Sequence, residues 1–136
     1  MVKRVVVVSG LSGAGKASIL RALEDIGYNA VDNPPLTLLE TLISRDDQPL
    51  AVGLDTRSRG FDGELVRRAV ARLKATPGVR AELVYAWADE AALLRRYTET
   101  RRRHPMAPQG RVIDGIRMEQ HVTRPLRDEA DLVIDT

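Results

Sequence analysis

The sequence has no cysteine, few aromatic residues and almost no excess of charge. Without cysteine it can form neither a disulfide nor a thiolate metal site, which fits a reducing cytoplasm. Lysine and arginine number 21 against 19 acidic residues, and a net charge of +2 does not indicate nucleic-acid binding by the chain as a whole. Aromatic residues make up 4% of the chain, which leaves little capacity to stack single-stranded RNA bases. No apolar run approaches the ~18 residues of a membrane-spanning helix, and no membrane contact is expected.

The apolar residues that are present suffice for one core. They make up 43% of 136 residues, which predicts a single domain. Short β-branched runs alternate with stretches of helical periodicity, a pattern typical of α/β proteins with a mainly parallel sheet. We predict strands near residues 3–9, 28–31, 50–54, 81–87 and 132–134, and helices near residues 15–26, 36–44, 62–75, 89–103 and 112–129.

A glycine-rich run follows the first predicted strand and consists of Gly10, Leu11, Ser12, Gly13, Ala14, Gly15, Lys16 and Ala17. It fits the P-loop pattern G-x-x-x-x-G-K-[ST] at every position except the last. A β-branched run precedes it and a helical pattern follows, as the motif requires. In such a loop, backbone N–H groups and the helix dipole face phosphates, and Lys16 adds a mobile charge. The sequence therefore predicts a P-loop NTPase-type fold that binds a nucleotide.

The last position of the motif departs from the pattern. Ala17 stands where a serine or threonine hydroxyl would bind Mg²⁺. Ser18 follows directly and is, with the loop, a further candidate nucleotide-binding residue, but on a helix it is rotated by about 100° from Ala17. We therefore expect nucleotide binding with weakened Mg²⁺ coordination, and NTP hydrolysis that is weak at best.

Acidic residues end two of the predicted strands. Asp55 follows the apolar run 50–54, where P-loop proteins keep the carboxylate that holds or orients Mg²⁺, and it is the predicted metal ligand. Arg57 could reach a phosphate or pair with Asp55. Asp32, beside Asn33, could be a second acid at the site or could cap the following helix.

The most basic stretch runs from residue 93 to residue 105 and contains five arginines and one glutamate. Kinases often use arginines on a mobile lid to neutralise the transferring phosphoryl group, so Arg101 and Arg102 are candidate phosphate ligands. Contact with RNA phosphates and a solvated helix face are the alternatives. His104 is expected to end a helix rather than to catalyse.

Two aromatic residues share one face of a predicted strand. Tyr85 and Trp87 are two positions apart, so their side chains point the same way. Contact with adenine is possible there, but a place in the core is the main expectation.

These segments together resemble the N-terminal domain of the RapZ/YvcJ family of bacterial P-loop nucleotide-binding proteins, the RNase adapters. The match covers nearly the whole chain and includes Ser9 to Lys16, Val-Asp-Asn-Pro at 31–34, Asp-Thr-Arg at 55–57, Thr-Arg-Arg-Arg-His-Pro at 100–105 and the segment 130–136. The resemblance implies ATP binding at Gly10 to Ala17 and GTP binding by Asp55, Thr56, Arg57 and Ser58. It assigns no catalytic residue.

The resemblance also implies a larger protein. In the family, the full-length adapter directs a small regulatory RNA to an endoribonuclease, and RNA recognition belongs to a C-terminal domain. We therefore expect residues 1–136 to be an N-terminal domain that contacts RNA and the endoribonuclease only together with that second domain; whether it forms a homo-oligomer is open. The alternative function is a small-molecule or nucleoside kinase, which uses the same fold and needs an intact Mg²⁺ site.

Overall fold

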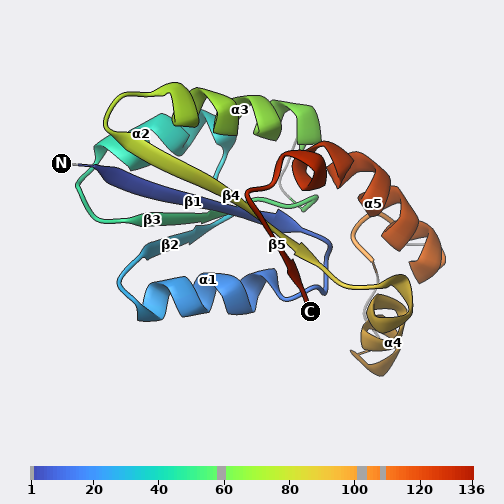
Figure 1. Ribbon diagram of the computed structural model, residues 1–136. Helices are drawn as coiled ribbons and strands as arrows, with labels where there is room; N and C mark the ends of the chain where they lie inside the picture. The colour runs from blue at the N-terminus through green and yellow to red at the C-terminus, as the bar shows by residue number, and fades with distance from the viewer. Residues whose placement is uncertain (1, 58–60, 101–103, 108–109) are drawn as a thin grey trace.

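A five-stranded parallel sheet forms the centre of the part of the chain that the computed structural model describes, which is all of it except residues 1, 58–60, 101–103 and 108–109 (Figure 1). The strand order is β2-β3-β1-β4-β5. The strands are β1 (Lys3–Gly10), β2 (Asn29–Asp32), β3 (Leu50–Gly53), β4 (Val79–Trp87) and β5 (Leu132–Asp135). The predicted α/β class with five parallel strands is confirmed.

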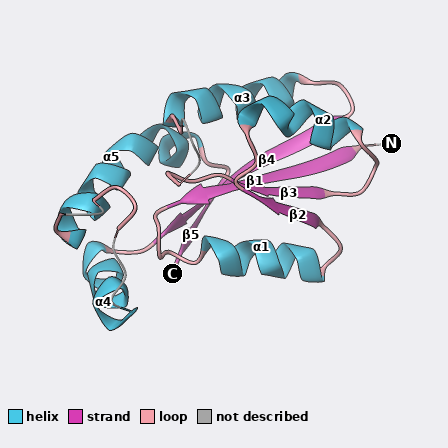
Figure 2. Ribbon diagram, turned by 180° about the vertical axis from the view of Figure 1, so that it is seen from behind, coloured by secondary structure: helices cyan, strands magenta, loops and turns pink. Residues whose placement is uncertain are grey.

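Helices cover both faces of the sheet (Figures 1 and 2). One face carries α1 (Lys16–Asp25), and the other carries α2 (Leu39–Ser44), α3 (Gly63–Ala75) and α5 (Val112–Glu129), with α4 (Glu90–Thr100) beside α5. The predicted helix 36–44 is divided into a 3-10 turn η1 (Leu36–Leu38) and α2. The connection from β1 to β2 runs toward one edge of the sheet and the later connections run toward the other, so right-handed crossovers place their helices on opposite faces.

Burial explains the composition of the central strands. Val5, Val7 and Val8 of β1 are fully buried because helices cover both faces of this strand. Tyr85 of β4 belongs to the core beneath α5, where its hydroxyl lies 2.7 Å from Thr123 Oγ1, and its predicted core position is confirmed. Trp87 is partly buried, with the Arg127 guanidinium 5.4 Å from its ring centroid.

The carboxyl ends of β1, β2 and β3 bring the predicted site segments to one edge of the sheet. Backbone hydrogen bonds fix their mutual positions: Leu54 N–H donates to the carbonyl of Val8 (2.9 Å) and Asn33 N–H to that of Gly53 (2.6 Å). The connection after β1 runs toward β2, whereas the connection after the neighbouring β3 runs the other way, toward β4. Such a reversal between neighbouring strands marks the usual ligand position in open parallel sheets. Within the described ranges, no helix is both long and apolar enough to cross a membrane.

Candidate functional site

The loop between β1 and α1 depends on glycine at two points. Gly10 has a φ of 139°, and a Cβ there would collide with the backbone of Ala86 on β4. Gly15 stands at the N-cap of α1 with a φ of 95°, in the left-handed region that favours glycine. These positions let the loop fold back over the carboxyl end of β1.

A cavity of about 310 Å³ opens above this loop. Its wall consists of most of the loop, residues that follow β3, one residue of α4 and one that follows α4. The lining residues are Gly10, Leu11, Ser12, Gly13, Gly15, Lys16, Ala17, Asp55, Arg57, Tyr97 and Pro105. The structure therefore brings the predicted loop and the predicted Asp55 and Arg57 together at one cavity.

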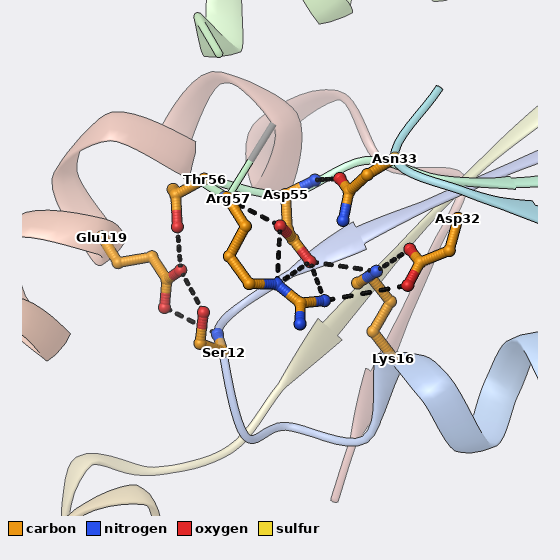
Figure 3. Close-up of polar contacts among 8 residues, drawn as sticks. All are labelled: Ser12, Lys16, Asp32, Asn33, Asp55, Thr56, Arg57 and Glu119. Atoms are coloured by element: carbon orange, nitrogen blue, oxygen red, sulfur yellow. Dashed lines mark hydrogen bonds and ion pairs between the residues drawn. The ribbon is translucent and has the colours of Figure 1, made fainter. Parts of the chain in front are cut away.

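Four alternating charges lie side by side at this edge of the sheet (Figure 3), and three of them, Lys16, Asp55 and Arg57, line the cavity. The buried Lys16 Nζ lies 2.5 Å from Asp32 Oδ1 and 3.0 Å from Asp55 Oδ2. Arg57 donates to both oxygens of Asp55, with Nη2 2.7 Å from Oδ2 and Nε 3.2 Å from Oδ1, and its Nη2 lies 3.8 Å from Asp32 Oδ2. Of the two roles considered for Asp32, the structure supports the acid at the site, because Pro35 stands at the N-cap of η1.

Asp55 is held as a carboxylate by its neighbours. Burial by itself would raise the pKa of Asp55, but hydrogen bonds from Arg57 and Lys16 outweigh it and hold the pKa well below its usual range. The same contact raises the pKa of Arg57. Asn33, whose φ of 53° is unusual for a residue other than glycine, accepts a hydrogen bond from the Asp55 N–H at 3.0 Å and joins the ends of β2 and β3.

A fully buried glutamate, Glu119 of α5, was not predicted as part of the site. Its carboxylate accepts hydrogen bonds from the Ser12 N–H (2.6 Å), the Ser12 hydroxyl (2.7 Å) and the Thr56 hydroxyl (2.7 Å) (Figure 3). It also lies 3.2 Å from His104 Nε2. His104 is also fully buried. No local pattern marks Glu119, because it is one acid among many in a helix of mixed charge.

Several predicted residues lie elsewhere or outside the described residues. Ala17 lines the first cavity from the exposed first turn of α1, whereas Ser18 lies elsewhere and lines a second cavity of about 480 Å³ with Ile19, Ala22 and Arg96. Ser58, Arg101 and Arg102 lie outside the residues that the structure describes, so their predicted roles stay predictions.

The described side chains around the cavity do not form a metal site by themselves. In the described part of the chain, no group of three or more histidine, aspartate or glutamate side chains is arranged to hold a metal. Asp55 already accepts hydrogen bonds at both carboxylate oxygens, and Ala17 has no oxygen in its side chain. A metal at this cavity would therefore depend on oxygens that a ligand or water supplies.

The parallel sheet, the glycine-rich loop between its central strand and α1, and a buried lysine at the start of that helix define a P-loop protein. The sequence model of the RapZ-like N-terminal domain matches residues 3–136, and the chain belongs to this family. The predicted family is thus confirmed.

Proteins with closely related sequences are known from bacteria. A nucleotide-binding protein of Granulibacter bethesdensis is 58% identical over 98% of this chain and 41% of its own length. Another, of Acidiphilium cryptum, is 57% identical over 100% of this chain and 45% of its own length. The chain thus spans less than half the length of these relatives.

Solved structures share the fold at much lower sequence identity. A shikimate kinase from Acinetobacter baumannii, in complex with shikimate, superposes with a TM-score of 0.64 at 17% identity and covers 100% of this chain and 84% of its own. A shikimate kinase from Bacteroides thetaiotaomicron gives a TM-score of 0.61 at 13% identity, over 98% and 86% of the two chains. At these identities the likeness shows a common P-loop fold alone.

Proposed function

We propose that this chain is a nucleotide-binding domain that holds the phosphates of ATP or GTP in the cavity above the loop. The observation that carries the proposal is the position of Lys16: its buried ammonium group lines a cavity of about 310 Å³ at the carboxyl end of β1. The names of the relatives from Granulibacter bethesdensis and Acidiphilium cryptum support it.

The loop backbone supports an anionic ligand. The N–H groups of Leu11, Ser12 and Ala14 donate within the protein. Those of Gly13 and Gly15 have no hydrogen-bond partner among the described residues, and the first turn of α1 leaves further N–H groups unpaired. Such groups at a helix N-terminus are typical phosphate ligands.

A second cavity favours a nucleotide over phosphate alone. It shares Gly13 and Gly15 with the first cavity and has the aliphatic side chains of Ile19 and Ala22 in its wall. Arg96 closes one side, where its guanidinium donates to the Gly13 carbonyl at 2.8 Å. A charged compartment next to a less polar one suits a ligand that has both phosphates and a base.

Mg²⁺ and hydrolysis take a secondary place in this proposal. Asp55 lines the cavity and is the carboxylate that would face a metal there, and Ala17 supplies no hydroxyl to it. Mg²⁺ keeps water ligands readily, so nucleotide binding tolerates this loss better than chemistry does. We infer a regulatory domain with weak hydrolysis, whose contacts with RNA and an endoribonuclease require parts of the longer relatives that this chain does not contain.

A small-molecule kinase is the second candidate function, favoured by the fold shared with shikimate kinases. A coupled assay of ATP consumption across nucleosides and sugars separates the two. Turnover at ordinary kinase rates of about 1–100 s⁻¹ with any acceptor would favour the kinase.

The proposed site is tested by replacing Lys16. Lys16→Ala removes a charge-assisted contact of about 1.5–3 kcal/mol, so ATP and GTP should bind about tenfold to hundredfold more weakly. Calorimetric titration of both nucleotides measures this, and Lys74→Ala is the control, because Lys74 is partly exposed and pairs with Asp131 instead of lining the cavity. Equal affinities of Lys16→Ala and the unchanged protein would refute the assignment.

A further inference from the structure

Glu119 connects the nucleotide cavity to α5. Its carboxylate is fully buried, and no lysine or arginine of the described ranges forms an ion pair with it. A buried charge without a cation is costly unless hydrogen bonds satisfy it. The hydrogen bonds around this carboxylate therefore indicate its role.

All the acceptor capacity of this carboxylate is used. Oε1 accepts from the Ser12 N–H at 2.6 Å and lies 3.2 Å from His104 Nε2. Oε2 accepts from the hydroxyls of Ser12 and Thr56, both at 2.7 Å. A carboxylate offers about four lone-pair positions, so four donors saturate it. The donors come from three segments of the chain, after β1, β3 and α4.

The hydrogen bonds of His104 assign its proton. Its Nδ1 accepts from the Met106 N–H at 3.0 Å, so the ring proton is on Nε2 and points to Glu119. The ring lies so close to α5 that a Cβ added at Gly115 would come within 2.6 Å of it. Glycine one turn before Glu119 therefore permits the contact between His104 and the carboxylate.

Each segment held by Glu119 supplies part of the cavity wall. Ser12 lines the cavity itself, Arg57 follows Thr56, and Pro105 follows His104. Resting on the proposed nucleotide function, we propose that Glu119 is a positioning residue: it holds these three walls at the separation that the nucleotide requires and touches no ligand itself.

The geometry also predicts which substitution is tolerated. In Glu119→Gln, the amide oxygen can accept from the Ser12 N–H and His104 Nε2, while the amide nitrogen donates to the two hydroxyls, which accept as well as they donate. Glutamine therefore keeps all four contacts without the charge. Alanine keeps none of them.

The experiment compares the affinity for ATP in the unchanged protein, Glu119→Ala, Glu119→Gln and the control Glu129→Ala, whose glutamate is exposed on the same helix. Each is titrated at a temperature at which circular dichroism shows it folded. We expect at least tenfold weaker binding for Glu119→Ala, at most threefold for Glu119→Gln, and no change for Glu129→Ala. If alanine prevents folding, Thr56→Val, which removes one donor, replaces it and should weaken binding at least threefold. The proposal is overturned if folded Glu119→Ala or Thr56→Val binds ATP as tightly as the unchanged protein. It is also overturned if Glu119→Gln binds ATP as weakly as Glu119→Ala.

A second measurement needs no nucleotide and separates this proposal from the proposed function. In ¹H–¹⁵N spectra of the ligand-free protein, the short bond to a carboxylate should place the Ser12 amide proton far downfield. Glu119→Ala should shift the amide signals of Ser12, Arg57 and Met106, and Glu129→Ala should not. If Glu119→Ala leaves these amide signals unchanged, the positioning role is refuted whether or not the protein binds ATP. If the signals shift but the unchanged protein binds no ATP, the contacts of Glu119 are upheld and the nucleotide function is refuted.

Discussion

If the proposed site holds phosphates, Asp32 competes with them for Lys16, so replacing it with asparagine should strengthen phosphate binding. The carboxylate of Asp32 lies 2.5 Å from Lys16 Nζ, and Asp55 holds the same ammonium from the other side at 3.0 Å. With Arg57 included, two cations face two carboxylates, so these four described groups together carry no net charge. Asp32→Asn leaves a net charge of +1 there, while Asp55 still orients the lysine.

Exposure limits the size of the effect. The Asp32 side chain is 50% exposed and the Asp55 side chain only 3%. Solvent therefore screens the attraction between Asp32 and Lys16 far more than that between Asp55 and Lys16. Two unit charges about 4 Å apart interact by about 1 kcal/mol in water, and exposed ion pairs contribute about 0–1 kcal/mol. We therefore expect Asp32→Asn to gain about 1 kcal/mol, or about fivefold in affinity for ATP.

The assay is calorimetric titration of ATP in EDTA, repeated with Mg²⁺. The control is Asp25→Asn, which changes the net charge equally at the exposed far end of α1, about 14 Å along the helix from Lys16. The gain should be largest in EDTA, because Mg²⁺ neutralises part of the phosphate charge that Asp32 repels. Affinity in EDTA that is unchanged or lower in Asp32→Asn would show that Asp32 does not compete for Lys16.

Three further substitutions test other parts of the site. Ala17→Thr adds a hydroxyl that can bind Mg²⁺, so nucleotide hydrolysis should rise, as measured by phosphate release over a series of Mg²⁺ concentrations. If the unchanged protein already hydrolyses nucleotide well and Ala17→Thr is no faster, the role given to Ala17 is contradicted. Gly10→Ala places a methyl group against the Ala86 backbone at a φ of 139°, and urea unfolding should show a loss of about 2–4 kcal/mol. Asp55→Asn removes a carboxylate whose pKa is lowered in the folded state, so its stabilisation is present above about pH 5 and declines as the pH falls below about 4. The difference in unfolding free energy between this variant and the unchanged protein should therefore be smaller at pH 3 than at pH 7, and a difference that grows toward acid would refute the account of the pKa.

Local patterns determined the fold class and the loop from the sequence alone. The glycines and lysine of residues 10–16 form a contiguous motif. The spacing of the apolar residues on either side indicates a strand before it and a helix after it. Asp55 was predicted for a similar reason, since the carboxyl ends of parallel strands meet at one edge of a sheet. The expectation that Ser18, rotated by about 100° on the helix, does not replace the missing hydroxyl at Ala17 stays a prediction.

Only the tertiary structure decided which side chains meet at that edge. Asp32 had two possible roles in the sequence, and its contact with Lys16 selected one, because β2 and α1 lie beside each other only when the sheet forms. Glu119 gave no signal at all, since its partner Ser12 is 107 positions away in the chain. A local pattern reports the conformation of its own segment, whereas a buried hydrogen-bond network depends on how distant segments pack, so α5 had to be placed against the loop before its glutamate could be recognised as part of the site.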